Sequence, residues 1–152
     1  MPVDVVTEIE IAVPRALVAA FAADPDNATA WYVNIKAVEW QTPPPLAVGS
    51  ELAFVAQFLG RTLTYTYEVV EHAPGERFVM RTAQGPFPMQ TTYTWQDAPT
   101  GGTHMTLRNT GEPSAFGKIA APMIAAAMRR ANTKDLQRLK MILEREPAAD
   151  PP

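Results

Sequence analysis

Few side chains in this 152-residue sequence could act as an acid or base, a nucleophile or a metal ligand. It has two histidines, His72 and His104, two serines, Ser50 and Ser114, and no cysteine. The sequence predicts that His72 is a solvated loop residue and that His104 lies on the outer face of the last strand. The sequence contains no His-x-His or Glu-x-x-His spacing that would suit a metal. With so few serines and histidines, it offers few candidates for a Ser-His-Asp triad. We therefore expect no catalytic residue, no metal site and no cofactor.

Hydroxyl groups are the remaining candidates for polar chemistry. Alternation places Tyr65, Tyr67, Thr82, Thr91 and Tyr93 on one face of the predicted strands. A tyrosine with its usual pKa of ~10 is a poor base, but it can donate a hydrogen bond to a ligand carbonyl or hydroxyl group. The simpler interpretation is that each hydroxyl group reaches a backbone carbonyl or the mouth of a pocket.

Two polar residues, Asn132 and Asp135, fall within the apolar stripe of the last predicted helix. A buried carboxylate without a partner is costly, so Asp135 should be paired or lie at the edge of the stripe. One hypothesis makes it a general base that reaches a pocket. The other, which we favour, gives it a structural role: it joins helix to sheet by pairing with a lysine, an arginine or an indole N–H. Substitution of Asp135 by alanine is then expected to lower stability without removing ligand binding.

Hydrophobic alternation and turn residues predict seven strands and a long final helix. The strands are expected over residues 3–11, 36–41, 51–58, 62–71, 77–83, 89–96 and 103–110. Strands joined by turns as short as Gly101-Gly102 must be antiparallel neighbours. A short helix over residues 15–22 and a second one that ends at Tyr32, capped by Asp26 or Asn27, follow the first strand. The final helix is expected over residues 114–146, and Pro122 is the one residue within it that could kink it.

The predicted inner face of the sheet collects most of the large aromatic side chains. The first half of the final helix, residues 119–127, is apolar on nearly every side, and such a helix must be covered on more than one side. The residues alone leave two interpretations open. Either these side chains fill a solid core, or they line a pocket that carries a few orienting hydroxyl groups.

Composition excludes several kinds of partner. The chain has 13 basic and 16 acidic residues, a formal net charge of −3, which argues against a nucleic-acid partner because such a partner needs a basic face. No segment reaches the ~20 apolar residues of a membrane span. An acidic segment precedes the apolar stretch at residues 13–23, the wrong order for a secretory signal, so we expect a cytoplasmic protein. We expect it to be a monomer or a homodimer.

Several segments resemble one known superfamily. Trp31 stands just before the second strand, and a hairpin-like run is followed by Arg77-Phe78. The segments that carry the likeness are 64–71, 77–78, 93–95, 102–103 and 128–140. They resemble the SRPBCC superfamily, which includes START lipid-transfer domains, the birch-pollen-allergen type and polyketide cyclase/dehydrase-like proteins. The likeness extends from Val3 to Glu146.

This resemblance implies the α+β helix-grip fold, in which a curved seven-stranded antiparallel sheet wraps around a long C-terminal helix, with two short helices between strands 1 and 2. It also implies an elongated apolar cavity between sheet and helix, and we therefore favour the pocket over the solid core. Residues 1–146 are expected to form a single domain and residues 147–152 a disordered tail. The residues expected to bind a ligand are Phe54, Phe58, Tyr65, Tyr67, Phe78, Met80, Thr91, Tyr93, Trp95, Met105, Met123 and Ala127.

Three functions are compatible with this interpretation. We favour the binding of a small hydrophobic or amphipathic molecule, such as a lipid, a polyketide or an aromatic metabolite. The resemblance also allows a polyketide cyclase/dehydrase-like enzyme that acts by pocket shape and desolvation, with Tyr65 or Tyr93 as hydrogen-bond donor. The third is a protein-interaction module of the chaperone-activator kind, which a large exposed apolar patch would indicate. The cone-shaped nuclear-transport-factor fold fits less well, because its long helices precede the sheet.

Overall fold

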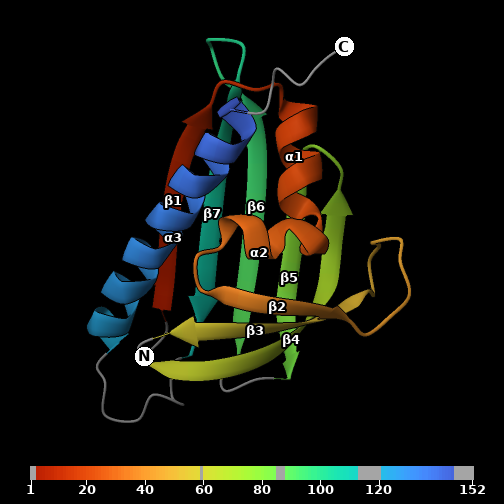
Figure 1. Cartoon of the computed structure of the whole chain (residues 1–152), viewed down its shortest axis with the longest axis vertical. Helices are drawn as coiled ribbons and strands as arrows, with labels where there is room; N and C mark the ends of the chain where they lie inside the picture. Colours follow the sequence, from red (N-terminus) through yellow and green to blue (C-terminus); the bar gives the residue numbers. More distant parts are fainter. Residues whose placement is uncertain (1–2, 59, 85–87, 113–120, 146–152) are drawn as a thin grey trace.

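One antiparallel sheet and a long helix dominate the computed structural model, which describes residues 3–58, 60–84, 88–112 and 121–145 (Figure 1). The strands lie in the order β1-β7-β6-β5-β4-β3-β2, so the first and last strands of the chain are neighbours. The elements are β1 (Val3–Ile11), α1 (Arg15–Ala23), η1 (Pro25–Asn27), α2 (Ala28–Trp31), β2 (Ile35–Trp40), β3 (Glu51–Phe58), β4 (Arg61–Ala73), β5 (Arg77–Gln84), β6 (Met89–Asp97), β7 (Thr103–Gly111) and α3 (Ala121–Arg145).

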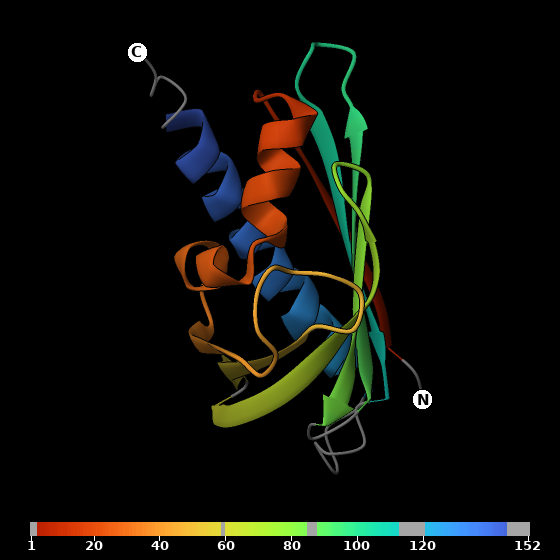
Figure 2. The ribbon, with the colours of Figure 1, turned by 90° about the vertical axis from the view of Figure 1, so that its right-hand side faces the viewer.

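The predicted helix-grip fold is confirmed. In Figure 2 the helices lie on one side of the sheet, and β2, β3 and β4 bend across beneath them. The predicted strands agree with the observed ones to within two residues at each end, because alternation and turn residues are local signals. The predicted helix segment 114–120, Glu146 and the tail 147–152 lie outside the described residues.

The link between β1 and β2 differs in detail from the prediction. It contains a 3-10 turn, η1, between the two short helices. The capping side chain is Asp24, whose carboxylate accepts the backbone N–H of Asp26 at 3.0 Å, and neither Asp26 nor Asn27 caps α2 with its side chain. The reason is Pro25, which has a φ suited to the first position of a helical turn and so starts the turn one residue earlier.

The two histidines are not loop residues. His72, predicted to be a solvated loop residue, lies within β4, with its ring edge-on to Phe78 at a centroid distance of 5.6 Å. The strand continues through it because β4 pairs with β5 as far as Ala73. His104 lies on the outer face of β7, as expected, and its Nε2 is 2.6 Å from a carboxylate oxygen of Glu8 on β1.

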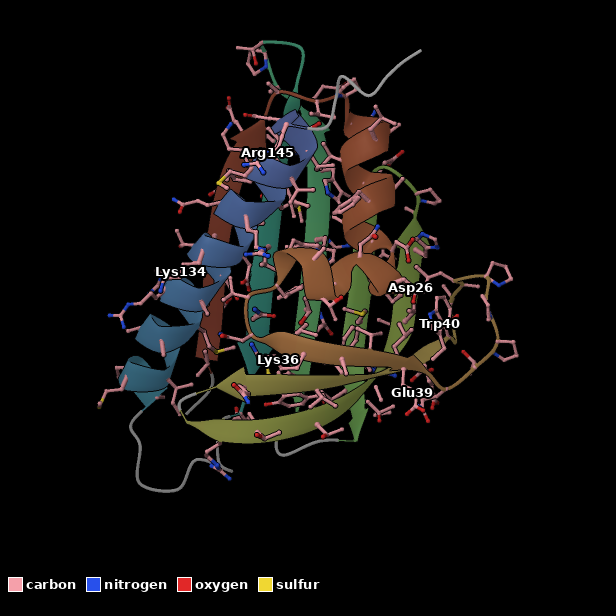
Figure 3. All side chains as sticks on the ribbon, in the orientation of Figure 1. Asp26, Lys36, Glu39, Trp40, Lys134 and Arg145 are labelled. Carbon is pink, nitrogen blue, oxygen red and sulfur yellow. The ribbon has the colours of Figure 1, made fainter. Side chains whose placement is uncertain are left out.

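Only one side of α3 is buried. Ile124, Met128, Leu136 and Leu139 face the core, whereas Met123 is 66% exposed. Lys134 and Arg145 project away from the sheet (Figure 3). The expectation that the first half of this helix is covered on more than one side is therefore wrong for its described part, since α3 packs along a single stripe.

Hydrogen bonds to the start of the chain fix the position of α3. The Glu144 carboxylate accepts the backbone N–H of Ala12 at 2.8 Å, and the Lys140 ammonium group donates to the carbonyl oxygen of Glu10 at 2.8 Å. Arg138 donates to the carbonyl oxygen of Ala30 at 2.6 Å. These contacts join α3 to α2 and to the end of β1, on the helix whose apolar stripe packs toward the sheet.

Candidate ligand-binding site

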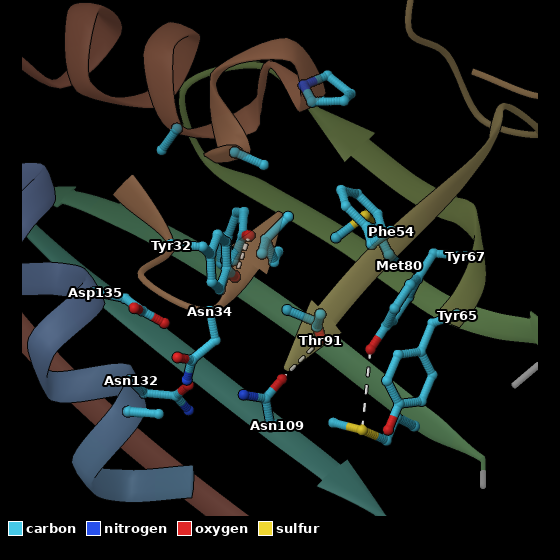
Figure 4. Close-up of a pocket in the computed structure, with 18 of the residues that line it drawn as sticks. Tyr32, Asn34, Phe54, Tyr65, Tyr67, Met80, Thr91, Asn109, Asn132 and Asp135 are labelled. Carbon is cyan, nitrogen blue, oxygen red and sulfur yellow. Dashed lines mark hydrogen bonds between the residues drawn. The ribbon is translucent and has the colours of Figure 1, made fainter. Parts of the chain in front are cut away.

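A cavity of about 140 Å³ lies between the inner face of the sheet, the α1–η1–α2 segment and α3. Figure 4 shows its lining side chains, which come from all of these elements. The core is therefore not solid: the strands hold the backbone of α3 at a distance that the side chains between them do not fill.

Aromatic and methionine side chains form most of the cavity wall. They are inner-face residues of successive strands, placed there by strand alternation. Phe54 and Tyr67, on neighbouring strands, pack edge to face with centroids 5.6 Å apart, a favourable arrangement for aromatic rings. The larger apolar and aromatic side chains that line the cavity are Tyr32, Ile35, Phe54, Leu63, Tyr65, Tyr67, Phe78, Met80, Met89, Tyr93 and Met128.

Four polar side chains gather at one end of the cavity. Asn34 follows α2, Asn109 lies on β7, and Asn132 and Asp135 lie on α3; we call these four residues the polar cluster. Residues i and i+3 of a helix share a face, which explains why Asn132 and Asp135 reach the same end. Figure 4 shows the four side chains converging there, away from Tyr65 and Met80.

Each end of this cluster is anchored by a hydrogen bond from another element. The hydroxyl group of Thr91 on β6 donates to Oδ1 of Asn109 at 2.7 Å. The backbone N–H of Val33 donates to Oδ1 of Asp135 at 2.8 Å. Nδ2 of Asn132 is buried and has no partner among the described residues. Some polar atoms of the cluster are therefore hydrogen-bonded within the protein, and others are not.

Asp135 is the ionisable carboxylate of the cavity's polar end, and only 3% of it is exposed. Burial raises the pKa of Asp135 to about 7, although the Val33 N–H and the positive charge of Arg138 act in the opposite direction. Its partner is a backbone N–H and not the predicted lysine, arginine or indole group. Asp135 therefore joins α3 to the segment before β2 and also faces the cavity.

A pair of tyrosines closes the cavity beside the polar cluster. The hydroxyl oxygens of Tyr32 and Tyr93 lie 2.5 Å apart. Burial, as the largest cause, raises the pKa of both tyrosines well above the usual value. Burial also raises the pKa of Tyr67 to about 12. These hydroxyl groups stay protonated near neutral pH, so they act as hydrogen-bonding groups and not as bases.

We expect the Tyr32–Tyr93 contact to appear as a coupling in the free energy of unfolding. Tyr32→Phe and Tyr93→Phe should each cost about 1 kcal/mol, because each leaves the other buried hydroxyl group without its partner. The double variant should cost little more than either single variant. Urea unfolding of the four proteins measures this coupling, and costs that add to within about 0.3 kcal/mol would contradict it.

A second hollow, of about 570 Å³, lies on the far side of the α1–η1 corner. It is lined by alanines of α1, by Trp40, Leu46 and His72, and by Trp95. The indole N–H of Trp40 donates to Asp26 at 2.8 Å, and Figure 3 labels both residues. The two hollows share Ala23, Asp24 and Pro25. We take the first as the candidate site, because it lies between sheet and α3 and contains the polar cluster.

Comparison with known proteins places this geometry in a family. Residues 2–144 match the model of a family described as polyketide cyclase/dehydrase and lipid transport. The chain belongs to this family. Its match covers β1 through most of α3, that is, every element that lines the cavity. No curated protein matches the chain.

Solved structures share the fold of this polyketide cyclase/dehydrase-family chain. A START superfamily protein from Mycobacterium smegmatis is 14% identical, with a TM-score of 0.81 over 93% of this chain and 97% of its own. The Zhui aromatase/cyclase from Streptomyces sp. R1128 is 17% identical, with a TM-score of 0.79 over 98% of both chains. The protein TTHA0849 from Thermus thermophilus is 20% identical, with a TM-score of 0.79 over 97% of this chain and 99% of its own.

The family cavity brings together seven of the twelve predicted ligand-binding residues. Those that line it are Phe54, Tyr65, Tyr67, Phe78, Met80, Thr91 and Tyr93. The side chain of Phe58 lies outside the described part of the chain. Trp95 lines the second hollow, and Met105 is fully buried in the core.

Two predicted residues of α3 do not line the cavity. Met123 points to solvent and Ala127 is only half-buried. The helix positions that face the core are one residue further along the chain than the predicted pair. Met128, Ala131, Asn132 and Asp135 line it instead. Of these, Asn132 and Asp135 are recognisable from the sequence as polar residues within an apolar stripe.

Tyr32, Asn34 and Asn109 were missed as site residues. Tyr32 and Asn34 lie around the irregular end of α2, where no periodicity indicates a side-chain direction, and Asn109 looks like an ordinary polar residue near the end of a strand. Among the described residues, no group of three or more His, Cys, Asp or Glu side chains could hold a metal ion. None of the described helices is both long enough and apolar enough to cross a bilayer.

Proposed function

We propose that this protein binds a compact amphipathic small molecule in the cavity between the sheet and α3. The observation that carries this proposal is an unfilled space with aromatic and methionine walls and a single cluster of polar side chains at one end. Binding sites for small molecules have this composition, with mostly apolar walls and a few polar groups that fix the orientation of the ligand.

The volume of the cavity favours a small ligand. Sites for drug-sized molecules have volumes of roughly 300–1,000 Å³. The 140 Å³ here is close to the ~150 Å³ of an engineered protein cavity that binds benzene. A space of this volume therefore suits a single ring or a short acyl chain, or one end of a longer molecule. Among the ligand classes considered above, an aromatic metabolite fits better than a long-chain lipid.

Filling the cavity should abolish binding. Ala131, a half-buried residue of α3, lines the cavity, and an Ala131→Phe side chain would occupy the space of a ring-sized ligand. We expect Ala131→Phe to weaken binding by about tenfold or more, since the ligand must then displace a packed side chain. Native mass spectrometry and thermal shift against a panel of single-ring and short-chain compounds measure this.

The matched control is Ala126→Phe, which adds the same ring to an exposed position of the same helix. It should leave every ligand-induced shift unchanged. If no compound in the panel binds the wild-type protein, or if Ala131→Phe binds as well as Ala126→Phe, the cavity is not the binding site.

A catalytic role is a second candidate, and one observation favours it. The pKa of the Asp135 carboxyl group is raised to about 7 by burial, which is the range in which a group can both accept and donate a proton near neutral pH. The buried tyrosines would then serve as hydrogen-bond donors. Such an enzyme should lose turnover in Asp135→Asn while it still binds its substrate, and unchanged turnover would exclude Asp135 as the base.

The exposed hydrophobic side chains do not favour a protein-interaction module. The large ones among the described residues come from five separate parts of the chain, and the two on α3 are 18 positions apart. They are Val6, Leu17, Val33, Val48, Met123 and Met141. Singly exposed apolar residues are common in soluble proteins, whereas a docking surface presents a contiguous patch.

A further inference from the structure

Two residues of the polar cluster each have one polar atom occupied and one open. Oδ1 of Asn109 accepts the Thr91 hydroxyl group, and Oδ1 of Asp135 accepts the Val33 N–H. Within the described part of the chain, Nδ2 of Asn109 and Oδ2 of Asp135 make no hydrogen bond. The Asn109 NH₂ group and one Asp135 oxygen are therefore open at the same end of the cavity, beside the side-chain amides of Asn34 and Asn132 (Figure 4).

The occupied atoms determine which atoms stay open. In the structure the Thr91 hydroxyl group donates to Oδ1 of Asn109, which leaves Nδ2 of Asn109 without this contact, and rotating Asp135 would only exchange its two oxygens. The donor and the acceptor are therefore held by groups on β6 and on the segment before β2. Asn132 adds a buried Nδ2 without a partner among the described residues. Buried polar groups are nearly always hydrogen-bonded in native proteins, so the buried Nδ2 of Asn132 calls for a partner. Nδ2 of Asn109 and Oδ2 of Asp135 are not among the buried atoms without a partner, so they are accessible to a ligand in the cavity.

The chemistry of the partner follows from this pairing. A carbonyl oxygen only accepts and would leave the ionised form of Asp135 unmatched, whereas an ammonium group only donates and would leave the amide N–H groups unmatched. A hydroxyl group does both through one oxygen atom. We propose that the polar cluster recognises a ligand hydroxyl group, which donates to Oδ2 of Asp135 and accepts from Nδ2 of Asn109. The ligand is then a compact alcohol or phenol; this inference rests on the proposed function.

Phenol and toluene provide a matched pair of probes, because they have the same number of heavy atoms and differ in one group, hydroxyl or methyl. Toluene should bind an apolar cavity more tightly by about tenfold, since burying a hydroxyl group without a partner is costly. In this protein we expect phenol to bind at least as tightly as toluene. Titrations followed by NMR of the methionine methyl groups report binding directly, because Met80, Met89 and Met128 line the cavity.

Asp135→Asn tests the assignment of the acceptor. The asparagine keeps an Oδ1 for the Val33 N–H but replaces the open oxygen with an NH₂ group, so the fold is retained and the acceptor is lost. Phenol binding should weaken by about tenfold and toluene binding should stay within twofold. Glu76→Gln, an acid-to-amide change in the exposed β4–β5 turn, should change neither.

The outcomes separate this inference from the proposed function. If toluene binds and phenol is weaker by about tenfold, the hydroxyl assignment is overturned while the cavity remains a binding site. If phenol is preferred equally in wild type and Asp135→Asn, the hydroxyl group is held elsewhere and the assignment to Asp135 is wrong. If neither compound binds, the proposal of a compact ligand fails and the inference fails with it.

Discussion

The wild-type protein is expected to become less stable as the pH rises from about 4 to about 8. Replacing Asp135 with asparagine is expected to remove this loss of stability. In the folded protein the pKa of Asp135 is about 7, whereas the value of an unperturbed aspartate is 3.8. The folded state therefore binds the proton more tightly than the unfolded state. The stability from this group is fully present below about pH 4, is lost as the pH rises to about 7, and stays constant above that.

The expected size of this effect is large for a single residue. A difference of about three pKa units corresponds to roughly 4 kcal/mol at most, at ~1.4 kcal/mol per unit. Tyr32 and Tyr93, which lie near Asp135, do not titrate in this range because their pKa values are raised above 10. Asp135 is therefore the source of the expected difference between the wild type and the asparagine variant.

Urea unfolding at about pH 5 and pH 8 measures this difference. Asp135→Asn keeps the acceptor for the Val33 N–H, so at pH 8 it should be more stable than the wild type by a few kcal/mol and at pH 5 by less. Glu76→Gln should follow the wild-type profile, because Glu76 lies in an exposed turn. Parallel pH profiles for the wild type and Asp135→Asn would show that Asp135 is not held in an environment that disfavours its charge.

Substitution of Trp31 by alanine should produce the largest loss of stability from a side chain near the site. Trp31 is fully buried and packs against Tyr32 at a centroid distance of 4.2 Å and against Tyr93 at 5.8 Å. Removing such a side chain costs about 3–5 kcal/mol, because the lost contacts are not recovered by collapse. With a total stability of ~5–15 kcal/mol for a typical domain, Trp31→Ala should unfold far more easily than the wild type.

Trp31→Phe separates packing from hydrogen bonding. The indole Nε1 of Trp31 has no partner among the described residues, so phenylalanine loses only volume and should cost less than half as much as alanine. Urea unfolding of both variants gives the two costs. Equal costs would indicate that the indole group itself, and not its packing against the two tyrosines, stabilises this region.

The strands, and the pairing of strands joined by short turns, were predictable because their signals are local, whereas the pairing of β1 with β7 joins distant parts of the chain. Alternation from Val3 to Ile11 fixes which side chains of β1 are buried, and the turn at Gly101-Gly102 fixes the pairing of β6 with β7. The same alternation correctly placed Tyr65, Tyr67 and Tyr93 on the inner face. Seven of the twelve predicted ligand-binding residues line the cavity for this reason.

Positions along α3 were less predictable. An apolar helix segment offers several faces of similar hydrophobicity, and the sequence does not say which one turns toward the sheet. The packing of the whole chain decides this rotation, in which Met128 and Asp135 face the cavity and Met123 lies in solvent. Arg138 and Lys140 donate to distant backbone carbonyl oxygens, and the Glu144 carboxylate accepts a distant backbone N–H.

By itself the sequence determined the α+β class, the antiparallel order of the strands and the apolar character of the inner face, since each depends on neighbouring residues and on short turns. Only the tertiary structure decided that a space of about 140 Å³ remains and that Asn34, Asn109, Asn132 and Asp135 meet at its end. The cavity is the small volume that remains because the side chains between sheet and helix do not quite fill the space that separates the two. The polar cluster brings Asn34 together with residues more than 70 positions further along the chain, and no local pattern encodes such a meeting.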